Sequence, residues 1–179
     1  MKEYEVSGIA TEATMNNADN NENYNDTAEK VEDRPLMFHI VGSGRSENAL
    51  RKLVDSKGLS RHFKFWGYRK DVRMFVNTFD ICVSCSLNEP FGINNLEYMF
   101  MKKPCVATNA GGIPEVFGDT NILIPPKDPV KLKDALRLYI KNKSRRDEEA
   151  MKGFERAKNV FTSDICFNKT MGVYNGLVR

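Results

Sequence analysis

The sequence has 179 residues, 41% of them hydrophobic, which is enough for one domain with its own core. Its longest apolar runs span only a few residues and none follows the N-terminus, so the sequence predicts neither a membrane-spanning helix nor a secretory signal. The net charge of +3 is unevenly divided: residues 1–33 carry two basic and nine acidic side chains, which leaves 25 basic and 15 acidic side chains for residues 34–179.

The basic main part of the chain suits an anionic ligand such as a phosphate or an anionic surface, although ordinary solvated lysines give the same count. Nucleic acid has only this charge in its favour, because the sequence contains no nucleic-acid recognition motif, and we expect none to bind. Four cysteines without a dense framework predict a reducing compartment, the cytoplasm.

The first 33 residues differ in composition from the rest. Tyr4–Ala10 (YEVSGIA) is compatible with a strand, Met15–Asp26 is asparagine-rich and predicts a loop, and Thr27–Arg34 is compatible with a short helix. We therefore divide the chain into an acidic N-terminal segment, residues 1–33, with a degenerate first strand and loop, and a main domain, residues 34–179.

From Pro35 onward, strand-like and helix-like patterns alternate. Ser46 and Asp128 are placed as helix N-caps, Pro129 as a first helical residue, and Gly58 as a helix stop. The expected strands cover residues 36–42, 63–67, 79–86, 104–108 and 121–126, and the expected helices cover residues 46–58, 71–78, 92–102, 128–142, 145–159 and 164–177.

This alternation predicts an α/β domain with a Rossmann-like parallel sheet and helices on both faces. Ligands of such sheets bind beyond the carboxyl ends of the strands. The loops expected at that edge contain GSGRSE, GYRKD, SLNEPFG and NAGGIPE.

Three patterns have ordinary structural explanations. GSGRSE has Glu47 where a dinucleotide fingerprint has its last glycine, so it predicts a tight strand-to-helix turn rather than a nicotinamide site. Cys82 and Cys85 lack a second pair at metal-binding spacing and predict core packing. His39 and His62 are isolated, and His39 lies in an apolar run typical of a core strand.

Two glutamates around a Phe-Gly pair are the strongest candidates for a site. A helix opening at Gly92 would present free backbone amides, which favour an anion. Glu97, beside an apolar stripe of that helix, is expected to be half-buried and to accept hydrogen bonds from vicinal hydroxyls, while Glu89 lies on the same rim. Alternatively, Glu97 only favours the helix dipole and Glu89 only caps a loop.

NEPFGINNLE resembles the E-x7-E motif of retaining family-4 glycosyltransferases with the GT-B fold, and KKPCVATNAGGIPEVF and NILIPPKDPVKLKDAL resemble the segments that follow it. FHIVGSG and FKFWGYRKDV occupy the expected places upstream. The resemblance covers about residues 35–179 and implies the nucleotide-sugar-binding half of the fold.

The resemblance implies a role for each matched residue. Glu89 would contact the transferred sugar near the reacting centre, and Glu97 would hold the ribose hydroxyls. The remaining substrate-binding residues would be Phe91, Gly92 and Ile93 through their amides, Tyr68 and Arg69 near the base, and Gly42 and Gly44 in the donor cleft. The implied chemistry uses a UDP- or GDP-sugar as donor substrate and neither a metal nor another cofactor.

Two departures from the family pattern open alternatives. No Lys or Arg occurs between Lys2 and Lys30, where the family places a cationic pair for the diphosphate, and the chain is short for a fold that includes an acceptor domain. We expect a cytoplasmic hexosyl transferase for a glycan or lipid-linked acceptor, with a contact at the membrane surface as one option. It would be completed by an acceptor domain or partner chain. The alternative is a non-catalytic nucleotide-sugar module or a subunit of a split enzyme.

Overall fold

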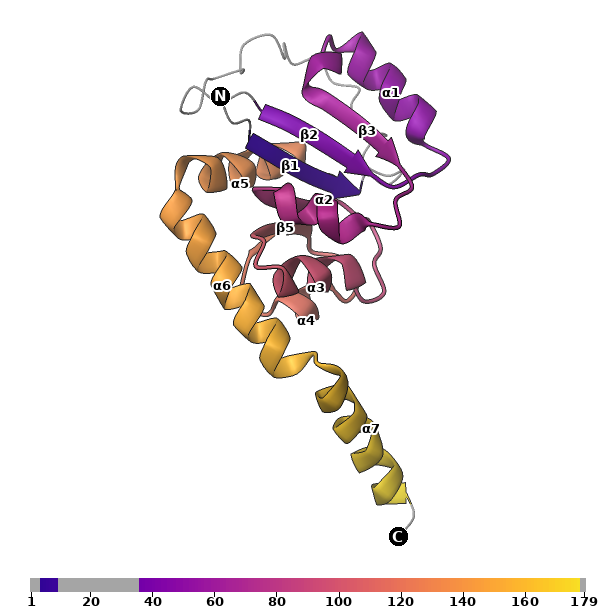
Figure 1. Cartoon of the computed structure of the whole chain (residues 1–179), viewed down its shortest axis with the longest axis vertical. Helices are drawn as coiled ribbons and strands as arrows, with labels where there is room; N and C mark the ends of the chain where they lie inside the picture. Colours follow the sequence, from indigo (N-terminus) through magenta and orange to yellow (C-terminus); the bar gives the residue numbers. More distant parts are fainter. Residues whose placement is uncertain (1–3, 10–35, 178–179) are drawn as a thin grey trace.

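The computed structural model describes residues 4–9 and 36–177, with side chains from residue 36 onward. Within these ranges the strands form a single six-stranded sheet in the order β3-β2-β1-β4-β5-β6, and each neighbouring pair runs parallel (Figure 1). The strands are β1 (Tyr4–Ile9), β2 (Leu36–Val41), β3 (Phe63–Gly67), β4 (Ile81–Ser84), β5 (Cys105–Thr108) and β6 (Ile122–Ile124). The predicted α/β class with a parallel sheet is confirmed.

Strand β1 lies at the centre of the sheet. It pairs with β2 on one side, where Val6 is opposite Phe38, and with β4 on the other, where Val6 is opposite Ile81. The predicted first strand is therefore confirmed, and it belongs to the sheet even though our division at residue 33 set it apart from the main domain. The loop and helix predicted for residues 15–26 and 27–34 lie outside the described residues.

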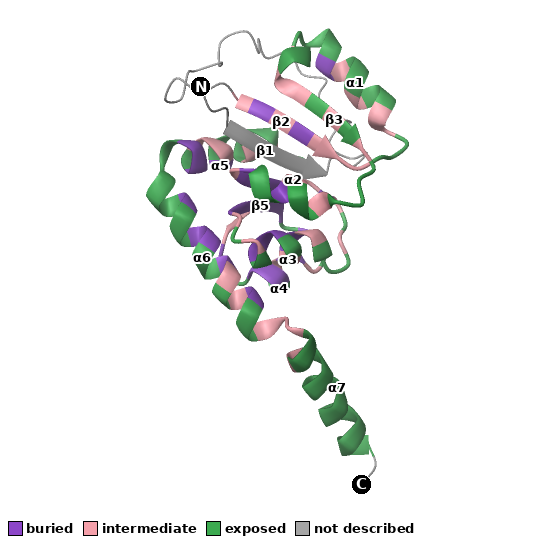
Figure 2. Cartoon of the chain, in the orientation of Figure 1, coloured by how far each residue is buried: buried purple, intermediate pink, exposed green. Residues whose placement is uncertain are grey.

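The sheet has two apolar faces because side chains alternate along each strand. One face packs Cys82, Cys105 and Ala107 against helices α2 (Val72–Thr78), α3 (Ile93–Phe100), α4 (Ile113–Phe117) and α6 (Lys143–Val160). The other packs Ile81, Val83 and Val106 against α5 (Pro129–Lys141), and Arg51 of α1 (Glu47–Ser56) lies 4.4 Å from the ring centre of Phe65. Strands β4 and β5 are buried throughout, as continuous apolar runs predict (Figure 2).

The helices follow the predicted segments closely. They are α1 (Glu47–Ser56), α2 (Val72–Thr78), α3 (Ile93–Phe100), α4 (Ile113–Phe117), α5 (Pro129–Lys141), α6 (Lys143–Val160) and α7 (Ser163–Leu177), with a 3-10 turn η3 (Ser60–His62). Asp128 and Gly58 cap their helices as the sequence indicates, whereas the Ser46 side chain, at the N-cap position of α1, makes no capping hydrogen bond. The Asp128 carboxylate accepts a hydrogen bond from the amide of Lys131 at 2.9 Å, and Gly58 adopts a left-handed φ of +67° after α1.

Helix α4 and turn η3 have no counterpart in the sequence prediction. Helix α4 was not predicted because its five residues are too few to form a periodic apolar pattern. Its chemical signals are present nonetheless, since Pro114 stands in the first turn and Gly118, with a φ of +61°, ends the helix.

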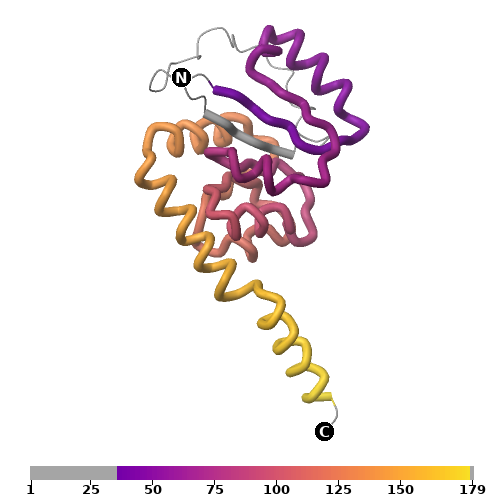
Figure 3. Tube along the Cα trace, viewed as in Figure 1, coloured from indigo at the N-terminus to yellow at the C-terminus, as the bar shows by residue number. Residues whose placement is uncertain are grey.

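The last two helices differ in how they contact the rest of the molecule. Helix α6 packs along α3, α4 and α5, whereas α7 extends beyond the other elements and buries none of its residues (Figure 3). The described helices include none with the length and apolar character needed to cross a bilayer.

Candidate functional site

The sheet order reverses between β1 and β4, and the main candidate site opens at the carboxyl edge beside that point. A cavity of about 210 Å³ lies between the end of β2, the β3–α2 turn and helix α3. Its lining residues are Val41, Gly42, Tyr68, Arg69, Val72, Val76, Phe79, Asn94, Glu97 and Tyr98.

Four predicted site residues meet in this cavity: Gly42, Tyr68, Arg69 and Glu97. They come from segments up to 55 positions apart in the sequence, so the fold alone brings them together. The expectation that Glu97 is half-buried is wrong, because its side chain is exposed at the cavity mouth. The reason lies in the neighbouring stripe: Ile93 is 66% exposed and Phe100 38%, so only Leu96 of this stripe packs against the core.

The cavity combines an apolar floor with polar groups at its rim. Arg69 is held by the Asp71 carboxylate, 3.3 Å from its Nε, and its guanidinium lies 5.0 Å from the Phe75 ring centre. Burial raises the pKa of the Tyr98 hydroxyl far above its ordinary value, against a smaller opposite effect of a hydrogen bond with Asn94, so Tyr98 stays neutral.

Asn94 is a lining residue whose side chain our sequence analysis did not consider. Its amide Nδ2 donates to Ser84 Oγ at 3.4 Å, at the end of β4. Asn94 and Glu97 are three positions apart on one helix and therefore share a face, a spacing that would have identified Asn94.

Glu89 lies in the loop before α3, and its side chain contacts the residue at the start of that helix. Its Oε1 accepts a hydrogen bond from the amide of Gly92 at 3.1 Å. Gly92 has a φ of +93°, a conformation that side chains disfavour. The first bond within α3 runs from the amide of Leu96 to the carbonyl of Gly92, so the amides of Ile93, Asn94 and Asn95 precede it and point out of the helix start.

A second glycine turn supports the Glu89 loop from behind. The amide of Gly112 donates to the carbonyl of Glu89 at 2.8 Å. A Cβ on Gly111 would lie 2.1 Å from that same carbonyl oxygen, and one on Gly112 would lie 2.5 Å from the Pro90 oxygen. The pair in NAGGIPE is therefore required for close approach of two backbones, a role that we did not predict from the sequence.

The other predicted residues lie around the cavity rather than in its wall. Phe91 is 41% exposed, and its ring packs edge-on against Phe161 at 5.9 Å, at the end of α6. Ile93 opens α3, and Gly44 belongs to the turn that starts α1, where its carbonyl accepts from the amide of Glu47. The tight turn predicted for GSGRSE is confirmed, while roles for these residues in binding stay predictions.

Cys82, Cys85, Cys105 and His39 behave as packing residues, whereas Cys166 is exposed. Cys82 and Cys105 are fully buried opposite each other on β4 and β5, and burial raises the pKa of the Cys85 thiol from 9.0 to about 11. His39 is buried, and its Nδ1 accepts a hydrogen bond from Trp66 Nε1 at 2.9 Å. Among residues 4–9 and 36–177 there is no cluster of three potential metal ligands.

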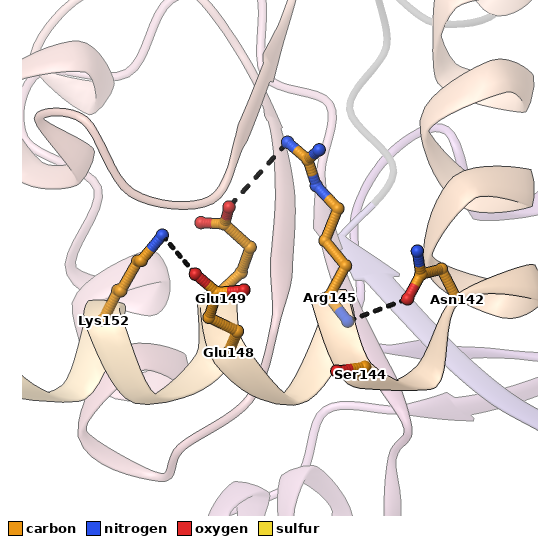
Figure 4. A pocket seen from close by; sticks show the side chains of 6 residues that line it. All are labelled: Asn142, Ser144, Arg145, Glu148, Glu149 and Lys152. Atoms are coloured by element: carbon orange, nitrogen blue, oxygen red, sulfur yellow. Dashed lines mark hydrogen bonds and ion pairs between the residues drawn. The ribbon is translucent and has the colours of Figure 1, made fainter.

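A second hollow, of about 350 Å³, lies on the first turns of α6 (Figure 4). Its charged groups pair with each other: Lys152 Nζ is 2.7 Å from Glu148 Oε1, and Arg145 Nη2 is 3.9 Å from Glu149 Oε1. The Asn142 side chain caps the helix by accepting from the amide of Arg145 at 2.9 Å. These contacts stabilise the helix start and leave little charge for a ligand.

The comparison with known proteins points to one family. Residues 9–142 match the family model of the glycosyl transferases group 1. The chain is 32% identical over 91 residues to the putative glycosyltransferase EpsD of Bacillus subtilis. The aligned region covers 51% of this chain and 23% of EpsD.

Solved structures agree with the fold. The UDP complex of Alr3699/HepE from Anabaena superposes with a TM-score of 0.78 at 19% identity, covering 97% of this chain and 49% of HepE. The C-terminal domain of LpcC from Francisella tularensis superposes with a TM-score of 0.71 at 21% identity, covering 89% of this chain and 87% of that domain. The chain thus spans about half the length of HepE and 23% of EpsD, whereas it matches most of the isolated LpcC domain. It is a GT-B-type domain and belongs to the glycosyl transferases group 1.

Proposed function

We propose that this chain is the donor-binding half of a retaining, family-4-type glycosyltransferase, which takes a UDP- or GDP-sugar and transfers its hexosyl group to a glycan or lipid-linked acceptor. The observation that carries the proposal is the cavity that unites Gly42, Tyr68, Arg69 and Glu97, one turn of α3 away from Gly92 and Glu89. UDP is the first nucleotide to test, because HepE was solved with UDP and with UDP-glucose.

In this proposal the nucleoside occupies the cavity. The carboxylate of Glu97 accepts from the ribose hydroxyls, and Tyr68 and Arg69 border the base. The apolar floor formed by Val72, Val76 and Phe79 suits the flat faces of a nucleoside.

The diphosphate then lies at the start of α3, on the amides that precede the first helical bond. Glu89 faces the sugar from the loop braced by Gly112. The departing phosphate would assist deprotonation of the acceptor on the same face of the sugar, which retains the anomeric configuration. In this proposal the step uses no metal ion. The positive charge near the cavity comes from the Arg69 side chain.

We further propose that an acceptor-binding domain or partner chain covers α7. This helix carries Phe167, Met171 and Tyr174 on one side at helical spacing, each at least 39% exposed. Leu177 lies on the flank of the same face and is 75% exposed, and Val173, on another side of the helix, is 66% exposed. So much exposed apolar surface on one helix is typical of an interface. In this proposal the protein acts in the cytoplasm, either free or in contact with a membrane surface.

Calorimetric titration of the chain with UDP, GDP and ADP, and with their glucose conjugates, tests the donor site. We expect binding of at least one nucleoside diphosphate and little transfer to a soluble acceptor by the chain alone. A folded sample that gives no heat with any of these ligands would refute the donor site.

The second candidate function is a nucleotide-sugar-binding module or a subunit of a split enzyme. The segment between Lys2 and Lys30 lacks basic residues, which favours this reading, because a departing diphosphate needs cations in the transition state. Sugar transfer after addition of an acceptor-domain chain would support the split enzyme. Donor binding without transfer in any such mixture would support the module.

A further inference from the structure

Asn95 is the most unusual buried residue near the proposed site. It lies in the first turn of α3 and is fully buried, and within the described part of the chain neither Nδ2 nor Oδ1 has a hydrogen-bond partner. An apolar side chain would fill the same space without leaving polar atoms unsatisfied. The amide therefore calls for a functional explanation.

The position of Asn95 gives that explanation. A Cβ on Gly92 would lie 3.0 Å from Asn95 Nδ2 and 3.6 Å from Glu89 Cγ. Because Gly92 has no side chain, the Asn95 amide and the Glu89 side chain border the same small space beside the helix start. Nδ2 is a hydrogen-bond donor without an acceptor, and the nearby carboxylate is an acceptor.

Glu89 holds the amide of Gly92 in this structure, at 3.1 Å. The Gly92 amide lies at the same helix start on which the proposed function places the donor, and we assign it to the donor as well, so the two roles compete. When the donor takes the amide, the Glu89 carboxylate must find another hydrogen-bond donor or lose its fixed orientation.

We propose that Asn95 is the positioning residue for Glu89: its Nδ2 donates to the carboxylate once a nucleotide sugar has taken the Gly92 amide, and so aims Glu89 at the sugar. This inference rests on the proposed function. It makes the buried Nδ2 a feature of the ligand-bound state, in which this donor gains an acceptor.

The test compares UDP with UDP-glucose in the full chain carrying Asn95→Leu, which replaces the amide with an apolar group of similar shape. We expect a higher melting temperature than wild type, unchanged affinity for UDP, and roughly tenfold weaker binding of UDP-glucose. A merely structural role would instead move the melting temperature and both affinities in the same direction. If GDP proves to be the nucleotide that binds, the same comparison uses GDP and GDP-glucose.

Tyr139→Phe is the matched control. Tyr139 is also fully buried, and among the residues that the structure describes its hydroxyl has no hydrogen-bond partner, but it packs on the opposite face of the sheet. Removing that hydroxyl should change stability and leave both affinities at the wild-type value. Asn95→Ala provides a smaller replacement in case leucine prevents folding, and it should show the same selective loss.

The outcomes separate the two claims. Equal loss of UDP and UDP-glucose binding in Asn95→Leu and Asn95→Ala, or no loss of either, overturns the role of Asn95 while leaving the donor site standing. If the wild-type chain binds no nucleoside diphosphate at all, the proposed function fails and this inference fails with it.

Discussion

Replacing Gly112 with alanine should damage the candidate site from behind. The added Cβ would lie 2.5 Å from the Pro90 carbonyl oxygen and 3.0 Å from Phe91 Cα. Favourable contacts between such atoms lie near ~3.5 Å, so one of the two backbones must move by roughly 1 Å. Neither neighbour is a flexible side chain that could turn away, which distinguishes this glycine from Gly118, whose nearest neighbour is the end of the Arg156 side chain.

The size of the effect follows from two contributions. Overpacking of this kind costs about 1–3 kcal/mol. Weakening the 2.8 Å bond between the Gly112 amide and the Glu89 carbonyl adds about 1 kcal/mol. We expect the free energy of unfolding to fall by about 2–4 kcal/mol, which corresponds to a melting temperature lower by roughly 5–10 °C for a chain of this length.

Thermal unfolding followed by circular dichroism, with titration of UDP and UDP-glucose below the melting temperature, measures both consequences. Because the displaced loop carries Glu89, affinity for UDP-glucose should fall more than affinity for UDP. Gly172→Ala is the control, since a Cβ there meets nothing within 4 Å and alanine favours a helix. If Gly112→Ala melts with wild type and keeps its affinity for UDP-glucose, the second glycine turn does not hold the Glu89 loop.

Three further results are expected. Glu97→Gln should weaken UDP binding by about 1–1.5 kcal/mol, which is near the lower end for a charged acceptor because this side chain is exposed. Glu89→Gln should weaken binding of UDP-glucose only. Equal effects of the two variants in calorimetry would contradict this division. Burial raises the pKa of Cys85 to about 11, so the unfolded chain ionises this thiol at a lower pH than the folded chain does. Wild type should therefore lose more stability than Cys85→Ala as the pH rises from 9 to 11. An equal fall in the melting temperature of both proteins over this range would contradict this. Val6→Pro removes a ladder hydrogen bond from the central strand. In urea unfolding it should lower the free energy of unfolding more than the same change at Lys64 on the edge strand β3, and equal losses would argue against the strand order.

Most of the fold could be predicted because its signals are local. Asp128 and Pro129 mark a helix start and Gly58 marks a helix end through backbone preferences that neighbouring elements do not alter. The buried strands β4 and β5 could be recognised from unbroken apolar runs. Their parallel arrangement follows from the alternation of strands and helices.

The site was harder to predict because it depends on tertiary packing. The apolar stripe Ile93, Leu96 and Phe100 was expected to face the core of the domain, but only Leu96 packs there. The buried face is instead formed by Asn95, Tyr98 and Met99, two of which carry polar groups. Likewise, the tight packing of Gly112 on the Glu89 loop joins two segments that no local pattern links.

The strand order also has a consequence for synthesis of the chain. β1 is made first, yet its two neighbours in the sheet come much later: Val6 pairs with Phe38 on one side and with Ile81 on the other. Until β4 has emerged from the ribosome, one edge of β1 stays unpaired, and an unpaired edge is where strands of different chains join. Sheet closure depends on these distant pairings, which slow folding. The nascent protein therefore passes through a period in which an edge of its own central strand is open to pairing with another chain.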